Sequence, residues 1–152
     1  MDQRKSLGML CIDLSNAFDG VHHDHLLAKV SEAGFPLYLL KITESFLSSR
    51  RFMVYIGNTA SGFRNLTVGV PQGSVLSLTM FNVYIHDAPV PPASILAEFA
   101  DDSAYLTAFH RTPTILRRLE TAASRAVRCF GELGIPVNGP KSAAMIFFTQ
   151  AG

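Results

Sequence analysis

The chain has 152 residues, enough for one domain with a hydrophobic core, and its formal net charge is only +1. Apolar residues make up 48% of it, and the mean hydropathy of +0.23 is high for a small soluble domain. No apolar run reaches the roughly 20 residues that span a bilayer, and no secretory signal is visible. The composition therefore disfavours a membrane span, a secreted protein and a strongly basic nucleic-acid binder. We interpret the apolar excess as surface that other segments cover.

The first half of the chain is predicted to contain a strand, two helices and a hairpin. Residues 7–12 form an apolar run typical of a buried strand. Helices are expected over residues 24–33, with Asp24 as the N-cap, and over residues 37–47. Strands are expected at residues 52–56 and 63–68, because apolar residues there flank a turn rich in Gly, Asn and Ser.

The second half is predicted to contain two further helices and three strands. A helix is expected over residues 75–86, after Ser74 as its cap, and a longer one from Thr112 to about residue 133. Residues 95–99 and 103–107 are expected to form a hairpin, and residues 143–148 a last strand. Strands with helices across one face predict an α+β fold, with residues 1–152 as a single domain.

Three carboxylates stand at the ends of predicted strands: Asp13 after the first strand, and Asp101 and Asp102 at the turn of the hairpin. Two adjacent like charges repel unless something neutralises them. Hard divalent cations take oxygen ligands, and a pair of such ions can clamp the attacking and leaving oxygens of a phosphoryl transfer. An isolated Asp-Asp pair is also common in solvated turns, so the metal interpretation depends on the other motifs.

Four segments follow one another in the order and rough spacing of the motifs of a known polymerase family. Residues 13–19 (DLSNAFD) resemble its motif A, residues 69–77 (GVPQGSVLS) motif B, and residues 99–102 (FADD) motif C. Residues 134–142, with Asn138, Lys141 and Ser142, resemble motif D. The chain is thus similar to the palm domain of a reverse transcriptase, most closely of the non-LTR, LINE-like retrotransposon group.

The resemblance implies a polymerase palm, an antiparallel sheet with helices packed on one face. It implies that Asp13, Asp101 and Asp102 are catalytic residues and bind two Mg²⁺ ions, or Mn²⁺ in their place. The backbone carbonyl of Leu14 is an additional metal ligand by the same resemblance. In the sequence, Asp19 is a poorer candidate, and a helix-cap or ion-pair role is expected for it.

The same resemblance assigns four residues to substrate binding. Phe18 is expected to pack under the deoxyribose and exclude a 2′-hydroxyl, Gln72 and Gly73 to approach the nucleotide and template, and Lys141 to lie near the triphosphate. Each also has a plain structural reading: a core ring, an ordinary polar loop and a surface lysine. Two further cations, Arg50 and Arg51, follow the second helix, where they suit the helix dipole or could contact template phosphate.

The sequence also departs from the family pattern. Leu78 stands where the family usually has Pro, and Asn16 replaces a common Lys. Segments that resemble the fingers and thumb are largely missing, so the chain resembles a palm from a longer polyprotein and is expected to be inactive alone. The two cysteines, Cys11 and Cys129, are expected to be buried, reduced thiols, because they are far apart and lack metal-ligand spacing.

The expected partners are an RNA template, a DNA primer, dNTP substrates and the fingers and thumb segments of the parent polyprotein, with no membrane. A retrotransposon lifestyle implies a nuclear location. Three alternatives remain: a viral RNA polymerase palm, a group II intron maturase, and an inert remnant that at most binds nucleic acid. Phe18 argues against RNA synthesis, and the three intact acids argue against long decay.

Overall fold

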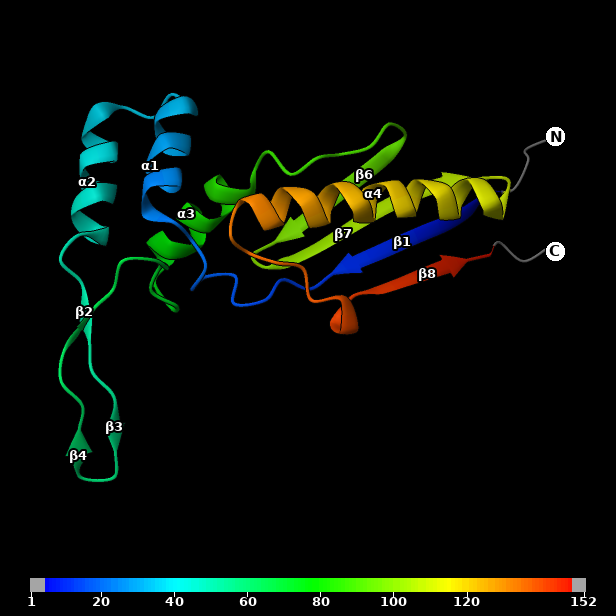
Figure 1. Cartoon of the computed structure of the whole chain (residues 1–152). Coiled ribbons are helices and arrows are strands. Elements are labelled where there is room, and N and C mark those ends of the chain that lie inside the picture. Colours follow the sequence, from blue (N-terminus) through cyan, green and yellow to red (C-terminus); the bar gives the residue numbers. More distant parts are fainter. Residues whose placement is uncertain (1–4, 149–152) are drawn as a thin grey trace. The chain divides into compact units, whose positions relative to one another are not determined.

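The computed structural model describes residues 5–148, which divide into two compact units. The first unit contains the chain up to Ala17 and from Asp87 onward, and the second runs from Phe18 to His86. Figure 1 shows the elements of both units, coloured along the sequence.

The first unit is built on a four-stranded sheet in the order β6-β7-β1-β8. All neighbouring strands are antiparallel. The strands are β1 (Ser6–Ile12), β6 (Ser94–Phe99), β7 (Asp102–Phe109) and β8 (Ala143–Phe147). In this order β1 and β7 are neighbours. Two of the three candidate acids lie at or beside the ends of these two strands.

A single long helix, α4 (Thr112–Glu132), lies across one face of this sheet (Figure 1). Its buried residues recur at three-and-four spacing and form an apolar stripe: Ile115, Leu119, Ala122, Ala126 and Phe130. The helix packs closely on β1 because Gly8 has no side chain, and a Cβ there would collide with Ile115. The α+β palm-type architecture expected from the sequence is confirmed.

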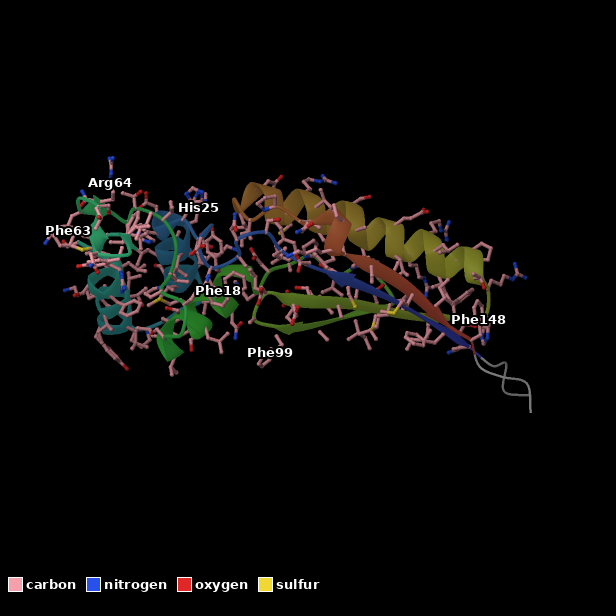
Figure 2. The ribbon with its side chains drawn as sticks, turned by 90° about the horizontal axis from the view of Figure 1, so that it is seen from below. Phe18, His25, Phe63, Arg64, Phe99 and Phe148 are labelled. Carbon is pink, nitrogen blue, oxygen red and sulfur yellow. The ribbon has the colours of Figure 1, made fainter. Side chains whose placement is uncertain are left out.

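The other face of the sheet carries exposed apolar side chains. Alternation along the strands puts Leu7, Ile95, Phe99, Met145 and Phe147 on this face, and all five are exposed. Figure 2 shows Phe99 pointing away from the side that α4 occupies. Part of the apolar excess of the composition is therefore located on this open sheet face, and a larger share of the exposed apolar side chains lies in the second unit.

The second unit contains three helices and a projecting β-arm. The helices are α1 (His23–Glu32), α2 (Leu37–Leu47) and α3 (Val75–Ile85), and α1 packs against both of the others. Short strands follow α2: β2 (Arg51–Phe52), β3 (Tyr55–Ile56), β4 (Thr59–Ala60) and β5 (Arg64–Asn65). β2 pairs with β5 and β3 with β4, and the resulting arm extends away from α2 (Figure 1).

The structure corrects several expected boundaries. The long strands expected at residues 52–56 and 63–68 are wrong, because the arm is exposed and has no buried face to hold a continuous ladder. The N-cap of α1 is His22, and Asp24 lies in the first turn, where its charge suits the helix dipole. Thr112 is the first residue of α4 and not its cap. The expected range of α2, residues 37–47, is confirmed.

Two expectations from composition can also be compared with the structure. Cys11 and Cys129 are both thiols as expected, but each is only partly buried. Within residues 5–148, no helix combines the length and the apolar character that a bilayer crossing requires.

Candidate active site

The turn of the β6–β7 hairpin lies one residue earlier in the chain than the expected turn, which consisted of Asp101 and Asp102. The last cross-strand pair is Phe99 with Asp102, so Ala100 and Asp101 are the two turn residues. Ala100 has a φ of 54°, and a positive φ at the first central residue is typical of a type II′ turn, where glycine is preferred. An alanine there costs about 1 kcal/mol, which makes this turn a strained element beside two acids.

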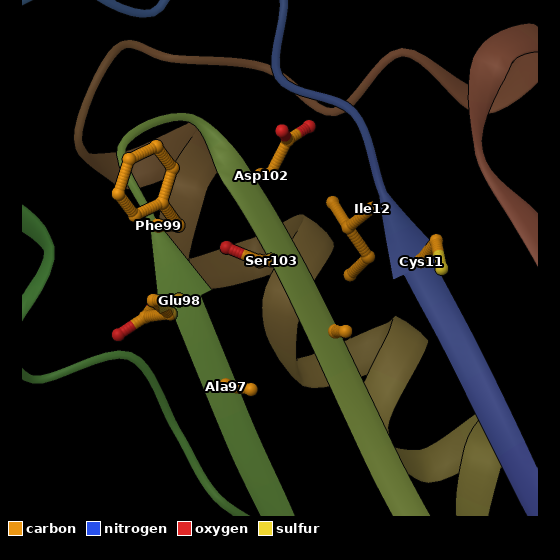
Figure 3. Close-up of a pocket in the computed structure, with 8 residues that line it drawn as sticks. Cys11, Ile12, Ala97, Glu98, Phe99, Asp102 and Ser103 are labelled. Atoms are coloured by element: carbon orange, nitrogen blue, oxygen red, sulfur yellow. The ribbon is translucent and has the colours of Figure 1, made fainter.

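The strand register brings the first and third acids opposite each other. The last β1–β7 pair is Ile12 with Ser103, and one further step places Asp13 opposite Asp102. Ile12 and Ser103 are buried on the α4 side, so alternation puts both carboxylates on the open face. Figure 3 shows Asp102 at the hairpin end, beside the chain that leaves β1.

The backbone of Asp13 is fixed by a segment far along the chain. The Asp13 N–H donates to Ser142 Oγ at 3.1 Å, and that hydroxyl donates to the Asn138 carbonyl at 2.8 Å. The Asn138 N–H in turn donates to the Asp13 carbonyl at 2.8 Å. The sequence alone predicts no role for Asn138 or Ser142, although both lie in the segment that resembles motif D.

The same ladder orients the backbone of Leu14. Leu14 forms an antiparallel bridge with Val137. The hydrogen bonds on either side of the bridge use the carbonyl of Asp13 (2.8 Å) and the N–H of Ser15 (2.9 Å). Backbone groups of successive residues point to opposite edges of a strand, so the Leu14 carbonyl is directed to the edge on which β7 lies. This is the edge that the candidate metal site needs.

The donor chemistry fits a hard divalent cation, because three carboxylates and a carbonyl supply oxygen ligands alone. Asp101 and Asp102 are exposed and Asp13 is partly buried. Across the part of the chain that the structure describes, no group of three His, Cys, Asp or Glu side chains is gathered closely enough to hold a metal. The acids are therefore brought to neighbouring positions by the sheet, but their side chains are not assembled into a closed ligand cage.

A hollow of about 320 Å³ lies on the sheet directly beside Asp102 (Figure 3). It is lined by Cys11, Ile12, Ala97, Glu98, Phe99, Asp102, Ser103 and Ala104. Most of this lining is apolar. A mostly apolar surface therefore lies next to the candidate carboxylates at this end of the sheet.

In the second unit, Phe18 is held by ring packing. Its ring stacks on Phe81 of α3 with centroids 4.7 Å apart and an angle of 27° between the planes. Phe81 is fully buried, whereas Phe18 is only partly buried. The structure thus gives Phe18 both a fixed orientation and an accessible edge.

Backbone hydrogen bonds tie the loop that contains Phe18 to the loop before α3. The Val70 N–H donates to the Phe18 carbonyl at 2.8 Å, and the Gly69 N–H donates to the Val21 carbonyl at 2.7 Å. His23 Nε2 lies 2.8 Å from the Gly69 carbonyl, so this nitrogen carries a proton and donates. These contacts join the segments that resemble motifs A and B into one structure.

Gly69 is required at the crossing of these two loops. Its φ is 87°, and a Cβ on it would lie 3.1 Å from the Cα and carbonyl oxygen of Asp19. Only glycine combines this backbone conformation with so close an approach. Asp19 therefore has a packing role through its backbone, which the sequence did not predict.

The remaining predicted residues are exposed. Gln72 and Gly73 form the turn before α3. Gly73 has a φ of 84°, and a Cβ added to it would meet no other atom within 4 Å. Lys141 ends the short 3₁₀ helix η1 (Gly139–Lys141), directly before Ser142. The structure thus leaves the side chains of Gln72 and Lys141 accessible to a ligand.

Both departures from the family pattern have local structural explanations. Asn16 has a φ of 50°, a left-handed conformation that Asn adopts more readily than Lys. Leu78 lies in the first turn of α3, and its N–H donates to the Ser74 carbonyl at 3.4 Å. Proline lacks an N–H and could not make this bond. Neither substitution disturbs the fold of its segment.

An antiparallel sheet with a helix on one face is the architecture of a polymerase palm-type fold. The chain matches the family described as reverse transcriptase (RNA-dependent DNA polymerase) over residues 1–149, and it belongs to this family. The resemblance found in the four motifs is confirmed.

Its relatives include proteins of mobile elements from Drosophila melanogaster. It is 39% identical over 113 residues to the probable RNA-directed DNA polymerase from transposon BS, covering 69% of this chain and 12% of that protein. It is 30% identical over 149 residues to the RNA-directed DNA polymerase from mobile element jockey, covering 93% of this chain and 16% of the relative. The chain thus spans less than a fifth of the length of these proteins.

Solved structures agree on the fold. Apo telomerase from Candida tropicalis, truncated from its C-terminal domain, matches 97% of this chain and 31% of its own with a TM-score of 0.68 and 16% identity. Telomerase from the same organism in complex with a fragment of telomeric RNA matches 94% of this chain and 26% of its own, with a TM-score of 0.65 and 13% identity.

Proposed function

We propose that residues 1–152 are the palm of an RNA-directed DNA polymerase, which adds dNTPs to the 3′-hydroxyl of a DNA primer on an RNA template. The observation that supports this proposal is the β1–β7 register, whose last pair, Ile12 with Ser103, lies one residue before Asp13 and one residue after Asp102. Family membership and the mobile-element relatives support it.

Asp13, Asp101, Asp102 and the Leu14 carbonyl would hold two Mg²⁺ ions, or Mn²⁺ in their place. When bound, such ions make a hydroxyl more acidic and neutralise charge on the attacked and leaving phosphates. The chain itself positions the donors. The Ser142 and Asn138 hydrogen bonds fix the backbone of Asp13, and the Leu14 bridge directs its carbonyl toward β7.

Phe18 would select deoxyribonucleotides. A ring held against Phe81 cannot easily move aside, so a ribose 2′-hydroxyl that meets it is excluded by steric contact. Gln72 and Gly73 would approach the nucleotide and the template through an exposed turn, and Lys141 would offer a cation to the triphosphate. We place the parent polyprotein on nuclear DNA, with its fingers and thumb segments completing the grip on primer and template.

Primer extension by the polymerase that contains this segment tests the proposal. Extension is expected to require an RNA template, a DNA primer, dNTPs and Mg²⁺, and to be abolished by Asp101→Asn. Glu120→Gln is the matched control, because it removes an exposed carboxylate from α4, away from the strand ends. Near-normal extension by Asp101→Asn would show that this acid is not part of the site.

We further propose that residues 1–152 alone do not extend a primer. The chain spans only 12% to 16% of the two relatives described above, and its net charge of +1 gives little attraction for phosphates. Robust extension by the purified 152-residue chain would contradict this, whereas extension that needs the neighbouring segments would support it.

A further inference from the structure

The three histidines around the start of α1 lie in different surroundings. His22 and His25 are exposed, with ring centroids 5.5 Å apart, and Figure 2 shows His25 directed outward from the helix. His23 is partly buried, and its Nε2 lies 2.8 Å from the carbonyl oxygen of Gly69, which is 46 positions further along the chain. The His23 side chain therefore reaches from α1 to the loop that precedes α3.

This contact completes the hydrogen bonding of a buried residue. Gly69 is buried, so water has little access to its backbone. Its N–H donates to the Val21 carbonyl at 2.7 Å, and its carbonyl accepts from His23. Both polar groups of the Gly69 backbone are thus bound to residues 21–23. Because a buried carbonyl that lacks a donor is costly, loss of the His23 donor should loosen this loop.

The anchored loop leads directly to the exposed turn at residues 72–73. The residue after Gly69, Val70, is also buried, and its N–H donates to the Phe18 carbonyl at 2.8 Å. Pro71 follows, and its ring restricts the backbone. Only these two residues separate Gly69 from the turn, so a shift of Gly69 is passed on to the turn.

Phe18 is fixed to the same frame by its ring. The ring stacks on Phe81 of α3 with centroids 4.7 Å apart, and α3 begins shortly after the turn at residues 72–73. One set of contacts, all within the second unit, therefore positions both the Phe18 ring and the turn. In this set His23 supplies a side-chain donor, whereas the bonds of the Gly69 and Val70 amides join backbone groups. The contribution of His23 can thus be removed by substitution.

We propose that His23 is a positioning residue for nucleotide selection. Its Nε2–H holds the Gly69 carbonyl, which keeps the turn at residues 72–73 in a fixed position relative to the Phe18 ring. This role rests on the proposed function, in which the turn and the ring meet the incoming nucleotide. His23 itself does not touch the nucleotide and acts through the backbone of Gly69.

Two substitutions separate the hydrogen-bond donor of His23 from the bulk of its side chain. Glutamine places an amide N–H as many bonds from Cβ as the Nε2 of histidine, so His23→Gln keeps a donor for Gly69. His23→Leu keeps a similar bulk and removes the donor. His25→Leu is the matched control, because His25 is exposed on the same helix. Val30→Ala is the stability control, because it removes buried packing from α1 and leaves the hydrogen bond intact.

Amide hydrogen exchange of the 152-residue chain examines the loop without any nucleotide. His23→Leu should speed the exchange of the Gly69 and Val70 amides about tenfold, because the bonds that protect them belong to the loosened loop. His23→Gln and His25→Leu should stay within about twofold of the native chain. Equal exchange of these amides in the native chain and in His23→Leu would overturn the proposal, because it would show that His23 does not hold the loop.

Single-nucleotide extension by the polymerase that contains this segment measures the consequence for selection. His23→Leu should lower the ratio of kcat/KM for dCTP to that for rCTP at least about fivefold, mainly through a higher KM for dCTP. His23→Gln should restore the native ratio, and His25→Leu and Val30→Ala should leave it unchanged. An equal fall of the ratio in His23→Leu and Val30→Ala would overturn the proposal, because general destabilisation would then account for it.

The role of His23 and the proposed function can fail separately. Near-normal extension by Asp101→Asn would contradict the proposed catalytic site, and the exchange of the Gly69 and Val70 amides would still decide whether His23 holds the loop. Loss of extension in Asp101→Asn, together with an unchanged ratio for dCTP and rCTP in His23→Leu, would overturn the role of His23 alone.

Discussion

In the first unit the candidate catalytic groups are charged and largely exposed. Their backbones are held instead, that of Asp13 by hydrogen bonds to residues 138 and 142 and that of Asp102 by its pairing with Phe99. In the second unit the candidate selectivity residue, Phe18, is packed on a buried ring, and its loop crosses Gly69 at van der Waals distance. The sheet therefore brings the acids to neighbouring positions, and bound ligands would be needed to draw their side chains together. The orientation of Phe18, in contrast, is fixed by packing within the protein. Substitutions of the acids in the first unit should therefore change activity without changing stability. Substitutions around Phe18 in the second unit should change both.

The largest effect is expected for Asp13→Asn. Its rate of primer extension should fall by more than about 100-fold. Removal of a residue that only supports a metal ligand typically costs about 10–100-fold. Its melting temperature should stay equal or rise slightly, because one of three neighbouring like charges is removed and the backbone bonds to residues 138 and 142 remain. Extension by the polymerase and thermal melting of the 152-residue chain measure the two effects. A large fall in melting temperature would mean that Asp13 serves the fold.

In the second unit, Gly69→Ala should destabilise the protein by about 2–4 kcal/mol. The new Cβ adds a close approach to the backbone of Asp19 to the cost of a positive φ. Gly73→Ala provides the control, because Gly73 has nearly the same φ of 84° but open space around it, so about 1 kcal/mol is expected. Urea unfolding of both variants measures the difference, and equal losses would show that the loop crossing is not tight.

Phe18→Val should act mainly on substrate choice. Removing the ring should shift the ratio of kcat/KM for dCTP and rCTP toward the ribonucleotide by about 10–100-fold, the range that a pocket gains by excluding one small group. The same variant should lose about 1–3 kcal/mol of stability, because it also removes the stacking contact with Phe81. An unchanged ratio together with the stability loss would identify Phe18 as a core residue only.

Much of the fold could be predicted from local pattern. The apolar stripe of α4 has the period of a helix, and the range of α2 follows from its periodicity between Pro36 and Ser48. The candidate acids could be found because they stand at the ends of apolar runs in a recognisable order. These features depend on neighbours in sequence, which pattern analysis reads directly.

What could not be predicted depends on contacts between distant segments. The bond from Asp13 N–H to Ser142 Oγ joins residues 129 positions apart, and nothing in either segment alone specifies it. The placement of the turn at Ala100 and Asp101 follows from the β6–β7 register, which the residue types did not favour. For the arm, the sequence predicts two long strands, because it shows the alternation of side chains but not that no other layer covers them.

Ser142→Ala tests the longest of these contacts. The change removes the acceptor for the Asp13 N–H and the donor to the Asn138 carbonyl, so a loss of about 1–2 kcal/mol is expected. Extension should fall by about tenfold, because the backbone of a metal-binding residue is loosened. Ser142→Thr, which keeps the hydroxyl, should restore both. Ser124→Ala removes only an exposed bond to the Glu120 carbonyl and should cost less than about 0.5 kcal/mol.

The smallest expected effect concerns two buried tyrosines, one in each unit. Burial raises the pKa of Tyr105 to about 12, with a further contribution from the charge of Glu98, and burial also raises the pKa of Tyr84. Tyr84 Oη accepts a hydrogen bond from the His22 N–H at 3.3 Å. Tyr105 Oη, on β7, has no hydrogen-bond partner within residues 5–148. At pH 7, Tyr105→Phe should therefore be neutral or stabilising by up to about 1 kcal/mol, whereas Tyr84→Phe should cost about 0.5–1.5 kcal/mol.

The pH dependence of stability provides the second measurement on Tyr105. A raised folded-state pKa means that the neutral form is favoured in the fold, so its full contribution is present below pH 10. That contribution is lost as the pH rises from 10, where the unfolded chain ionises, to about 12, where the folded protein does. The native chain should lose at most about 2–3 kcal/mol over the whole window through Tyr105, and about half of that by pH 11. Tyr105→Phe should remove that part of the loss. Denaturant unfolding at pH 9 and pH 11 measures the difference, and identical losses in both proteins would show that the Tyr105 hydroxyl reaches water.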